Sequence, residues 1–129
     1  MTKLVALFCT CVFLFPNIAS ADAQVNEWIG QWEMNHDGWR GTLVIADSKV
    51  DCATSPWCHL VLRYIDGNGK QITGKIGKID QKFQHMTFSL NFPNNTQKFD
   101  AYLFSWDKRK MAGVTYWGGR TFGFFALKK

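Results

Sequence analysis

The 129-residue sequence has few of the patterns that identify most enzymes. It contains no glycine-rich loop that would cradle a phosphate, no paired-carboxylate site and no nucleophile elbow. Its three histidines form no histidine-rich signature. Helical periodicity is almost absent beyond the first residues. These absences disfavour nucleotide-binding enzymes, the common hydrolases and helical folds.

The sequence also lacks an apolar run long enough to span a membrane as a helix. The run LVALFCTCVFLF covers residues 4–15, whereas a spanning helix needs about 20 residues. It follows Lys3 and precedes a proline and small residues with Ala-x-Ala patterns, an order typical of a cleavable signal peptide. We therefore predict a signal peptide over residues 1–23 and a secreted or periplasmic protein; a membrane anchor is the alternative.

Acidic residues are fewer than basic ones, 10 against 15, so the formal net charge is +5. Cleavage after Ala23 would remove one charge of each sign and leave residues 24–129, a length that suits one domain with a modest core. A basic exported protein can meet anionic glycans, cell-wall polymers or membrane surfaces, or the charge serves solubility alone. Export disfavours nucleic acid as a partner.

Cysteines are scarce outside the predicted leader, where only Cys52 and Cys58 remain. Two cysteines this close in an exported chain predict one disulfide. A metal site that includes the adjacent His59 is the alternative, but no second cysteine or histidine pair has suitable spacing. We expect no bound metal.

What the mature region does contain is β-prone segments separated by glycine, asparagine, aspartate and proline. In residues 83–92, Met86, Phe88, Leu90 and Phe92 alternate with polar residues, which is typical of a strand with one buried face. We predict eight strands, at residues 29–35, 38–46, 57–66, 70–80, 83–92, 96–106, 109–117 and 120–128.

The connections between these segments predict how the strands are arranged. Only residues 47–57 form a long link; the others are too short for a parallel crossover, so consecutive strands should pair antiparallel. Closing an eight-stranded meander on itself removes both exposed edges. The predicted fold is therefore all-β, a single small antiparallel up-and-down eight-stranded β-barrel over residues 24–129, with an open two-sheet sandwich as the alternative.

The first two predicted strands resemble those of known barrels. Gly30-x-Trp32 and Asn35-x-x-Gly38, followed by TLVI at residues 42–45, resemble the opening of avidin-type barrels. Gly-x-Trp is also typical of lipocalin-like barrels, so the resemblance is to the calycin-type eight-stranded fold in general. It implies the same barrel and a small-ligand site.

The departures from the avidin pattern concern the ligand. The residue after Gly38 is Trp39, where the family has a hydroxyl that bonds biotin, and no aspartate stands inside the last strand in the family's manner. Biotin binding therefore mostly does not carry over. Of the family's polar contacts the resemblance carries over Asn35, with Tyr64 and Thr73 as loose candidates.

The pair His36-Asp37 raises the question of catalysis. Adjacent residues in a turn point in divergent directions, so the pair is a poor acid–base dyad. His85 alternates with the apolar face and should point outward, and the meander places His59 at the opposite barrel end from His36. We expect a protein that is not an enzyme and needs no cofactor.

Alternate loops of a meander share one end of the barrel, so the turns HDG, DGNG, PNN and WGGR should gather at one opening. We predict that this opening binds a small ligand, such as a sugar or another small polar or apolar molecule. The expected roles are stacking on Trp39 and Trp117, hydrogen bonding to Asn35 and Tyr64, and an anion contact from Arg120.

Other functions remain open at this point. The first alternative is a protein-binding module, such as an exported hydrolase inhibitor that acts through the barrel loops. The residues at the opening are equally compatible with ordinary turns. An outer-membrane barrel is disfavoured because Lys75, Lys78 and Lys98 fall within strands and no lipid-facing apolar band runs through all eight.

Overall fold

The computed structural model describes residues 21–80 and 82–129. Residues 1–20 of the predicted signal peptide lie outside the described part of the chain. The described part begins with the short helix α1 (Ala21–Val25), which runs into the 3₁₀ helix η1 (Asn26–Trp28). No helix within the described residues is long and apolar enough to cross a membrane.

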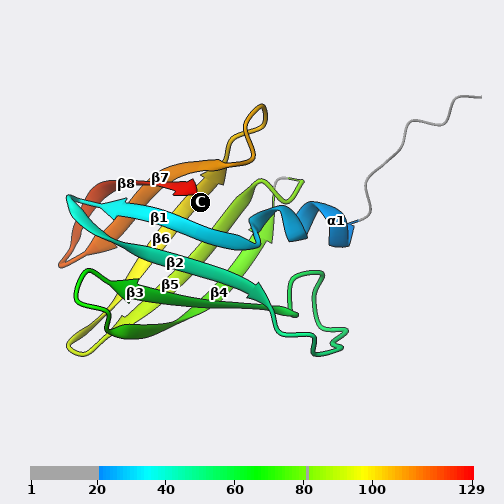
Figure 1. The fold of residues 1–129 in the computed structure, drawn as a ribbon, viewed down its shortest axis with the longest axis horizontal. Coiled ribbons are helices and arrows are strands. Elements are labelled where there is room, and N and C mark those ends of the chain that lie inside the picture. Colours follow the sequence, from blue (N-terminus) through cyan, green and yellow to red (C-terminus); the bar gives the residue numbers. More distant parts are fainter. Residues whose placement is uncertain (1–20, 81) are drawn as a thin grey trace, which may run out of the picture.

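Eight strands follow in the predicted order. They are β1 (Gly30–His36), β2 (Trp39–Asp47), β3 (Leu60–Asp66), β4 (Gln71–Asp80), β5 (His85–Phe92), β6 (Asn95–Leu103), β7 (Lys110–Trp117) and β8 (Arg120–Lys128). Each strand pairs antiparallel with the next, and β1 also pairs with β8, from Trp32 opposite Lys128 to His36 opposite Phe124. The sheet is a closed up-and-down barrel (Figure 1), which confirms the predicted fold and excludes the open sandwich.

Two predicted strand boundaries differ from the observed ones by three residues. The segment predicted at residues 96–106 leaves the sheet after Leu103, because the chain turns back to β7 there and the Lys110 N–H donates to the Asp107 carbonyl within the turn. Residues 57–59 form a turn in which the Leu60 N–H donates to the Trp57 carbonyl. Local hydrogen bonds replaced ladder bonds at both places.

Aromatic side chains fill the middle of the barrel. The inward faces of β5, β6 and β8 bring Phe88, Phe99 and Phe124 together, with Phe88 and Phe99 stacked 4.7 Å apart between ring centroids. All three rings are buried and belong to one continuous core with Trp32 and Leu43. Eight strands leave an interior that side chains can fill, and this interior is occupied at mid-height.

The end of the barrel from which β1 starts, here called the base, is covered by the N-terminal helices (Figure 1). Trp28 is fully buried, and its indole N–H donates to the Phe83 carbonyl at 2.7 Å. The Trp32 indole N–H donates to the Trp28 carbonyl, and the Lys128 ammonium lies 4.8 Å from the Trp32 ring centroid. The predicted disulfide between Cys52 and Cys58 is present in the long β2–β3 loop.

The opposite end, here called the mouth, carries four tight turns, as predicted. They join β1 to β2, β3 to β4, β5 to β6 and β7 to β8 (Figure 1). In the first, Asp37 and Gly38 both have positive φ, at 51° and 88°, the geometry of a two-residue hairpin whose twist matches that of the strands. The mouth is therefore bordered by hairpins, with the aromatic core beneath it.

Candidate functional site

The sheet opens at the mouth between β6 and β7. Their ladder ends at the pair Lys98–Tyr116, yet β6 begins three residues earlier, at Asn95, and the β7–β8 hairpin continues to the pair Trp117–Arg120. Because the two segments diverge beyond the last pair, a groove of about 290 Å³ forms between them. This rim groove is lined by residues 95, 96, 98 and 116–121.

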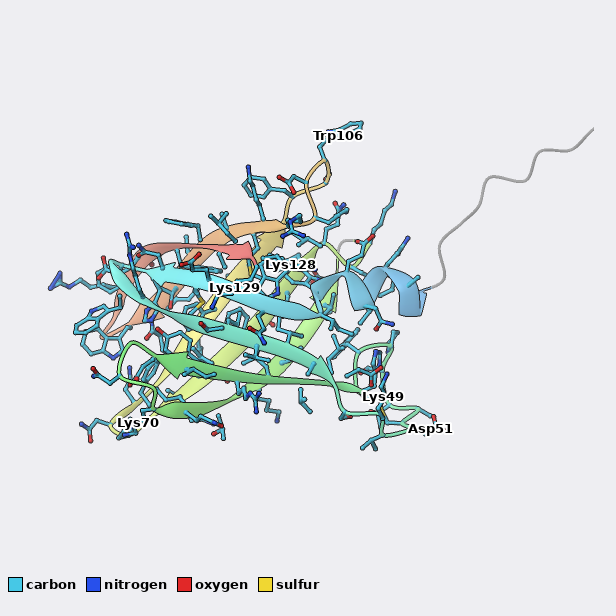
Figure 2. The ribbon with its side chains drawn as sticks, viewed as in Figure 1. Lys49, Asp51, Lys70, Trp106, Lys128 and Lys129 are labelled. Atoms are coloured by element: carbon cyan, nitrogen blue, oxygen red, sulfur yellow. A yellow bond between two sulfur atoms is a disulfide. The ribbon has the colours of Figure 1, made fainter. Side chains whose placement is uncertain are left out.

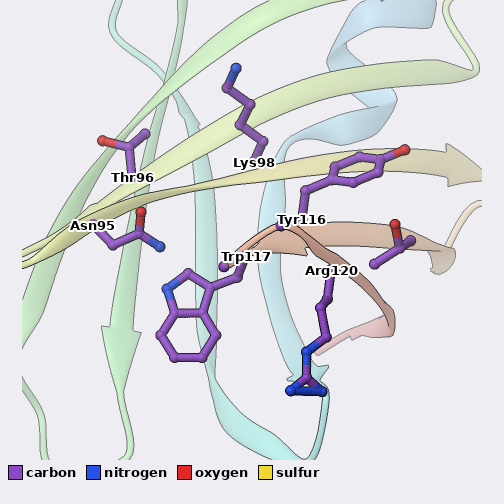
Figure 3. A pocket seen from close by; sticks show the side chains of 9 residues that line it. Asn95, Thr96, Lys98, Tyr116, Trp117 and Arg120 are labelled. Carbon is purple, nitrogen blue, oxygen red and sulfur yellow. The ribbon is translucent and has the colours of Figure 1, made fainter.

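The rim groove combines an aromatic ring, a cation and an amide (Figure 3). In that view the Trp117 ring lies between the side chains of Asn95 and Arg120. The Trp117 side chain is 55% exposed, so its ring face is free to pack against a ligand. Gly118 and Gly119 both have positive φ and form the turn that holds Trp117 opposite Arg120.

Beneath the mouth, a buried polar network lies on top of the aromatic core. The Gln97 side-chain amide donates to Thr115 Oγ1 at 2.9 Å, and the Thr115 hydroxyl donates to the Lys98 carbonyl at 2.8 Å. The same Gln97 nitrogen lies 3.4 Å from His36 Nδ1, and His36 Nε2 lies 3.2 Å from the Tyr64 hydroxyl. Because an amide N–H only donates, His36 Nδ1 accepts and its Nε2–H donates to Tyr64.

The two titratable members of this network are held neutral. Burial lowers the pKa of His36 from its ordinary value, and the neighbouring Asp37 carboxylate only partly offsets this effect. Burial, assisted by the Asp66 carboxylate, raises the pKa of Tyr64 to about 12. Near neutral pH the network therefore supplies hydrogen bonds without net charge, and the charge at the mouth resides in surface groups such as Arg120.

The structure brings together some of the predicted site residues and separates others. Trp117 and Arg120 are register partners and line the rim groove, whereas Trp39 is 74% exposed on the β1–β2 hairpin and is outside the groove lining. Tyr64 is buried under the mouth. Thr73 is exposed on the outer face of β4, away from the interior.

Asn35 lies on the outward face of β1, where its side-chain oxygen accepts the Gly38 N–H at 2.9 Å. It therefore stabilises the β1–β2 turn. His36 points inward and is buried, whereas Asp37 occupies the turn, so the pair forms no acid–base dyad in this arrangement.

Several residues of the groove and of the polar network were not predicted from the sequence, among them Asn95, Gln97 and Thr115. For Gln97 the sequence did carry a signal. It belongs to the same every-second-residue series as Phe99, Ala101 and Leu103, so its side chain shares their inward face. The position of Asn95 at the groove depends on where the β6–β7 ladder ends, which strand patterning does not specify.

A second polar cluster lies on the outer wall, well away from the rim groove. His85 Nδ1 lies 2.6 Å from Asp80 Oδ1, its Nε2 contacts Asp100, and its ring stacks on Tyr102 with centroids 4.5 Å apart. Within the described residues, no group of three or more histidine, cysteine or acidic side chains is arranged to hold a metal ion.

Comparisons with known protein families, with curated proteins and with solved structures found no match for this chain.

Proposed function

We propose that this protein is a non-catalytic ligand-binding β-barrel, exported from the cell, that takes a small ring-shaped ligand with a negative group at the rim groove. The observation that carries the proposal is the opening between β6 and the β7–β8 hairpin, where Trp117, Arg120 and Asn95 line one groove. A sugar acid has matching chemistry, with a ring face for Trp117, a carboxylate for Arg120 and hydroxyls for Asn95.

The filled interior confines the proposed site to the rim of the mouth. Phe99 and Phe124 occupy the space that a central ligand would need. The polar network under the mouth supports the rim from below, because the Thr115 hydroxyl bonds the Lys98 carbonyl at the point where the sheet opens. A buried side chain thus joins β6 to β7 directly below the opening.

The test is a thermal-shift titration with glucuronate, with glucose as the neutral control. A ligand at 100 times its dissociation constant should stabilise the protein by about 2.7 kcal/mol. Trp117→Ala and Arg120→Ala should remove the glucuronate shift. Trp106→Ala and Arg63→Ala are the matched controls, since both side chains are exposed and outside the rim groove. An equal response from all four variants would contradict the proposal.

A second candidate function is a protein-binding module, and the exposed tryptophans at the mouth favour it. Trp39 and Trp117 are 74% and 55% exposed, and exposed aromatic anchors are frequent at protein interfaces. In that case substitutions at the mouth would abolish binding of a protein partner, and no small molecule would shift the melting temperature.

A further inference from the structure

A second groove continues from the rim groove down the outer wall of the barrel. It has a volume of about 390 Å³ and is lined by residues 75, 77, 87–89, 98–100 and 116. The rim groove and this wall groove share Lys98 and Tyr116, which are register partners on β6 and β7. The two hollows therefore meet along one pair of residues.

The shared pair belongs to a row of outward-facing residues that follows the curved barrel wall across five strands. Each member is the register partner of the next, and the row runs from β4 to β8 as Lys75, Ser89, Lys98, Tyr116 and Thr121. Neighbouring strands lie about 4.8 Å apart, so along the wall the row is about 19 Å long and the backbone positions of its two lysines are about 10 Å apart.

The shape of the wall groove follows from small residues beside this row. Ser89 separates the two lysines with a short side chain. Gly77 has no side chain and stands where the register between β4 and β5 shifts, between Ile76 and Lys78. The long side chains of the two lysines thus border a hollow whose floor is formed by small residues.

The two lysines of the row are available to pair with an anionic group of a ligand. Among the described residues, neither Lys75 nor Lys98 forms an ion pair, whereas Lys78, the nearest lysine along β4, lies 3.7 Å from Asp80. The one carboxylate in the wall groove, Asp100, contacts His85. The groove is therefore electropositive, with the Ser89 hydroxyl between its two cations and the Tyr116 ring on the far side of Lys98.

We propose that the rim and wall grooves together bind a linear anionic polysaccharide, laid across β4–β8 with one charged sugar in the rim groove. This inference rests on the proposed function, since it extends the ligand of the rim. Alternating cations, hydroxyls and aromatic rings match a chain in which charged sugars alternate with neutral ones. Duplex DNA carries one charge per about 1.7 Å, and two lysines about 10 Å apart are sparse for such a ligand.

The experiment compares a short hyaluronan oligosaccharide, in which glucuronate alternates with a neutral sugar, with glucuronate itself by isothermal titration calorimetry. The oligosaccharide should bind more tightly than glucuronate. Added salt should weaken the binding of the oligosaccharide more than the binding of glucuronate, because the oligosaccharide makes more charge contacts. A neutral chitin oligosaccharide of the same length should bind weakly.

Two variants isolate the wall groove. Lys75→Glu should weaken oligosaccharide binding about five- to tenfold, because an attractive exposed contact becomes repulsive. The same substitution should leave glucuronate binding unchanged. Ser89→Tyr should have a similar effect by filling the hollow without changing charge. Lys110→Glu is the control, since Lys110 is exposed at the base end of β7, outside both grooves.

The outcomes separate the two proposals. If glucuronate binds but the oligosaccharide is no tighter, or if Lys75→Glu matches Lys110→Glu, the wall groove is overturned and the rim site stands. If neither sugar binds, both proposals fail. If single-stranded DNA binds as tightly as the oligosaccharide at the same salt concentration, the ligand class is overturned in favour of nucleic acid.

Discussion

Gly41 determines where the Tyr64 ring lies. A Cβ added to Gly41 would collide with the Tyr64 hydroxyl and would lie 2.6 Å from the Ile65 carbonyl oxygen. The backbone atom cannot move aside easily, so Gly41→Ala should displace Tyr64 from His36 and cost about 1–3 kcal/mol of unfolding free energy. Urea unfolding measures this loss.

Gly123→Ala is the matched control, since an added Cβ there has no neighbour within 4 Å. It should be neutral or stabilise the protein by up to about 1 kcal/mol through the unfolded state. Equal unfolding midpoints for the two variants would show that Gly41 is not needed for close approach.

His36 and His85 should give the protein opposite responses to pH. Burial lowers the pKa of His36 below its ordinary value of 6.5, so the unfolded state binds the proton more tightly. The stability from His36 is complete above that value and is lost as pH falls. For His85, burial lowers the pKa, but the hydrogen bonds to Asp100 and Asp80 outweigh it and raise the pKa overall. Its contribution is complete below 6.5 and is lost as pH rises.

The measurement is urea unfolding of the parent protein, His36→Gln and His85→Gln between about pH 5 and about pH 8. The stability difference between parent and His36→Gln should shrink toward acid, and the difference for His85→Gln should shrink toward alkali. Differences that do not change with pH would mean that neither histidine changes its pKa on folding.

At the scale of elements, the strands and turns were predictable because their signals are local. The alternation of Met86, Phe88 and Leu90 placed β5 correctly, and Asp37-Gly38 placed the first hairpin. The short helices α1 and η1 were not predicted. They are a few residues long and gain their stability from burying Val25 and Trp28 against the barrel, which is a tertiary effect that no local pattern carries.

The η1 helix should matter to stability far more than its length indicates. Trp28→Ala would empty a fully buried site at the base and remove the bond to the Phe83 carbonyl, so it should cost about 3–5 kcal/mol. Trp106 is the matched control, because it extends from the β6–β7 loop with its side chain fully exposed (Figure 2). Trp106→Ala should change the urea midpoint little, within about 0.5 kcal/mol; similar losses for both would contradict this role of η1.

For the whole molecule, closure was predictable but its consequences for the site were not. Short links, and the two exposed edges that an open eight-stranded meander would leave, indicated a barrel, and residues such as Trp117 and Arg120 were expected at the mouth. The rim and wall grooves depend on register: on where the Lys98–Tyr116 ladder ends and on the shift beside Gly77. Register is set by how all eight strands pack around one core, so local composition did not reveal it.

Closure itself should be essential for folding. Deleting residues 124–129 removes the β8 residues that pair with β1 and takes the buried Phe124 and Ala126 from the core. The edge of β1 and the base half of β7 would then be unpaired, so the truncated chain should lose its near-ultraviolet circular dichroism and aggregate on size-exclusion chromatography. Removing Lys129 alone deletes only the backbone bond to Gln31 and its ammonium contact with Thr42, so this control should stay monodisperse. If the chain that lacks residues 124–129 still unfolds cooperatively, an open sheet is stable without the pairing of β1 with β8.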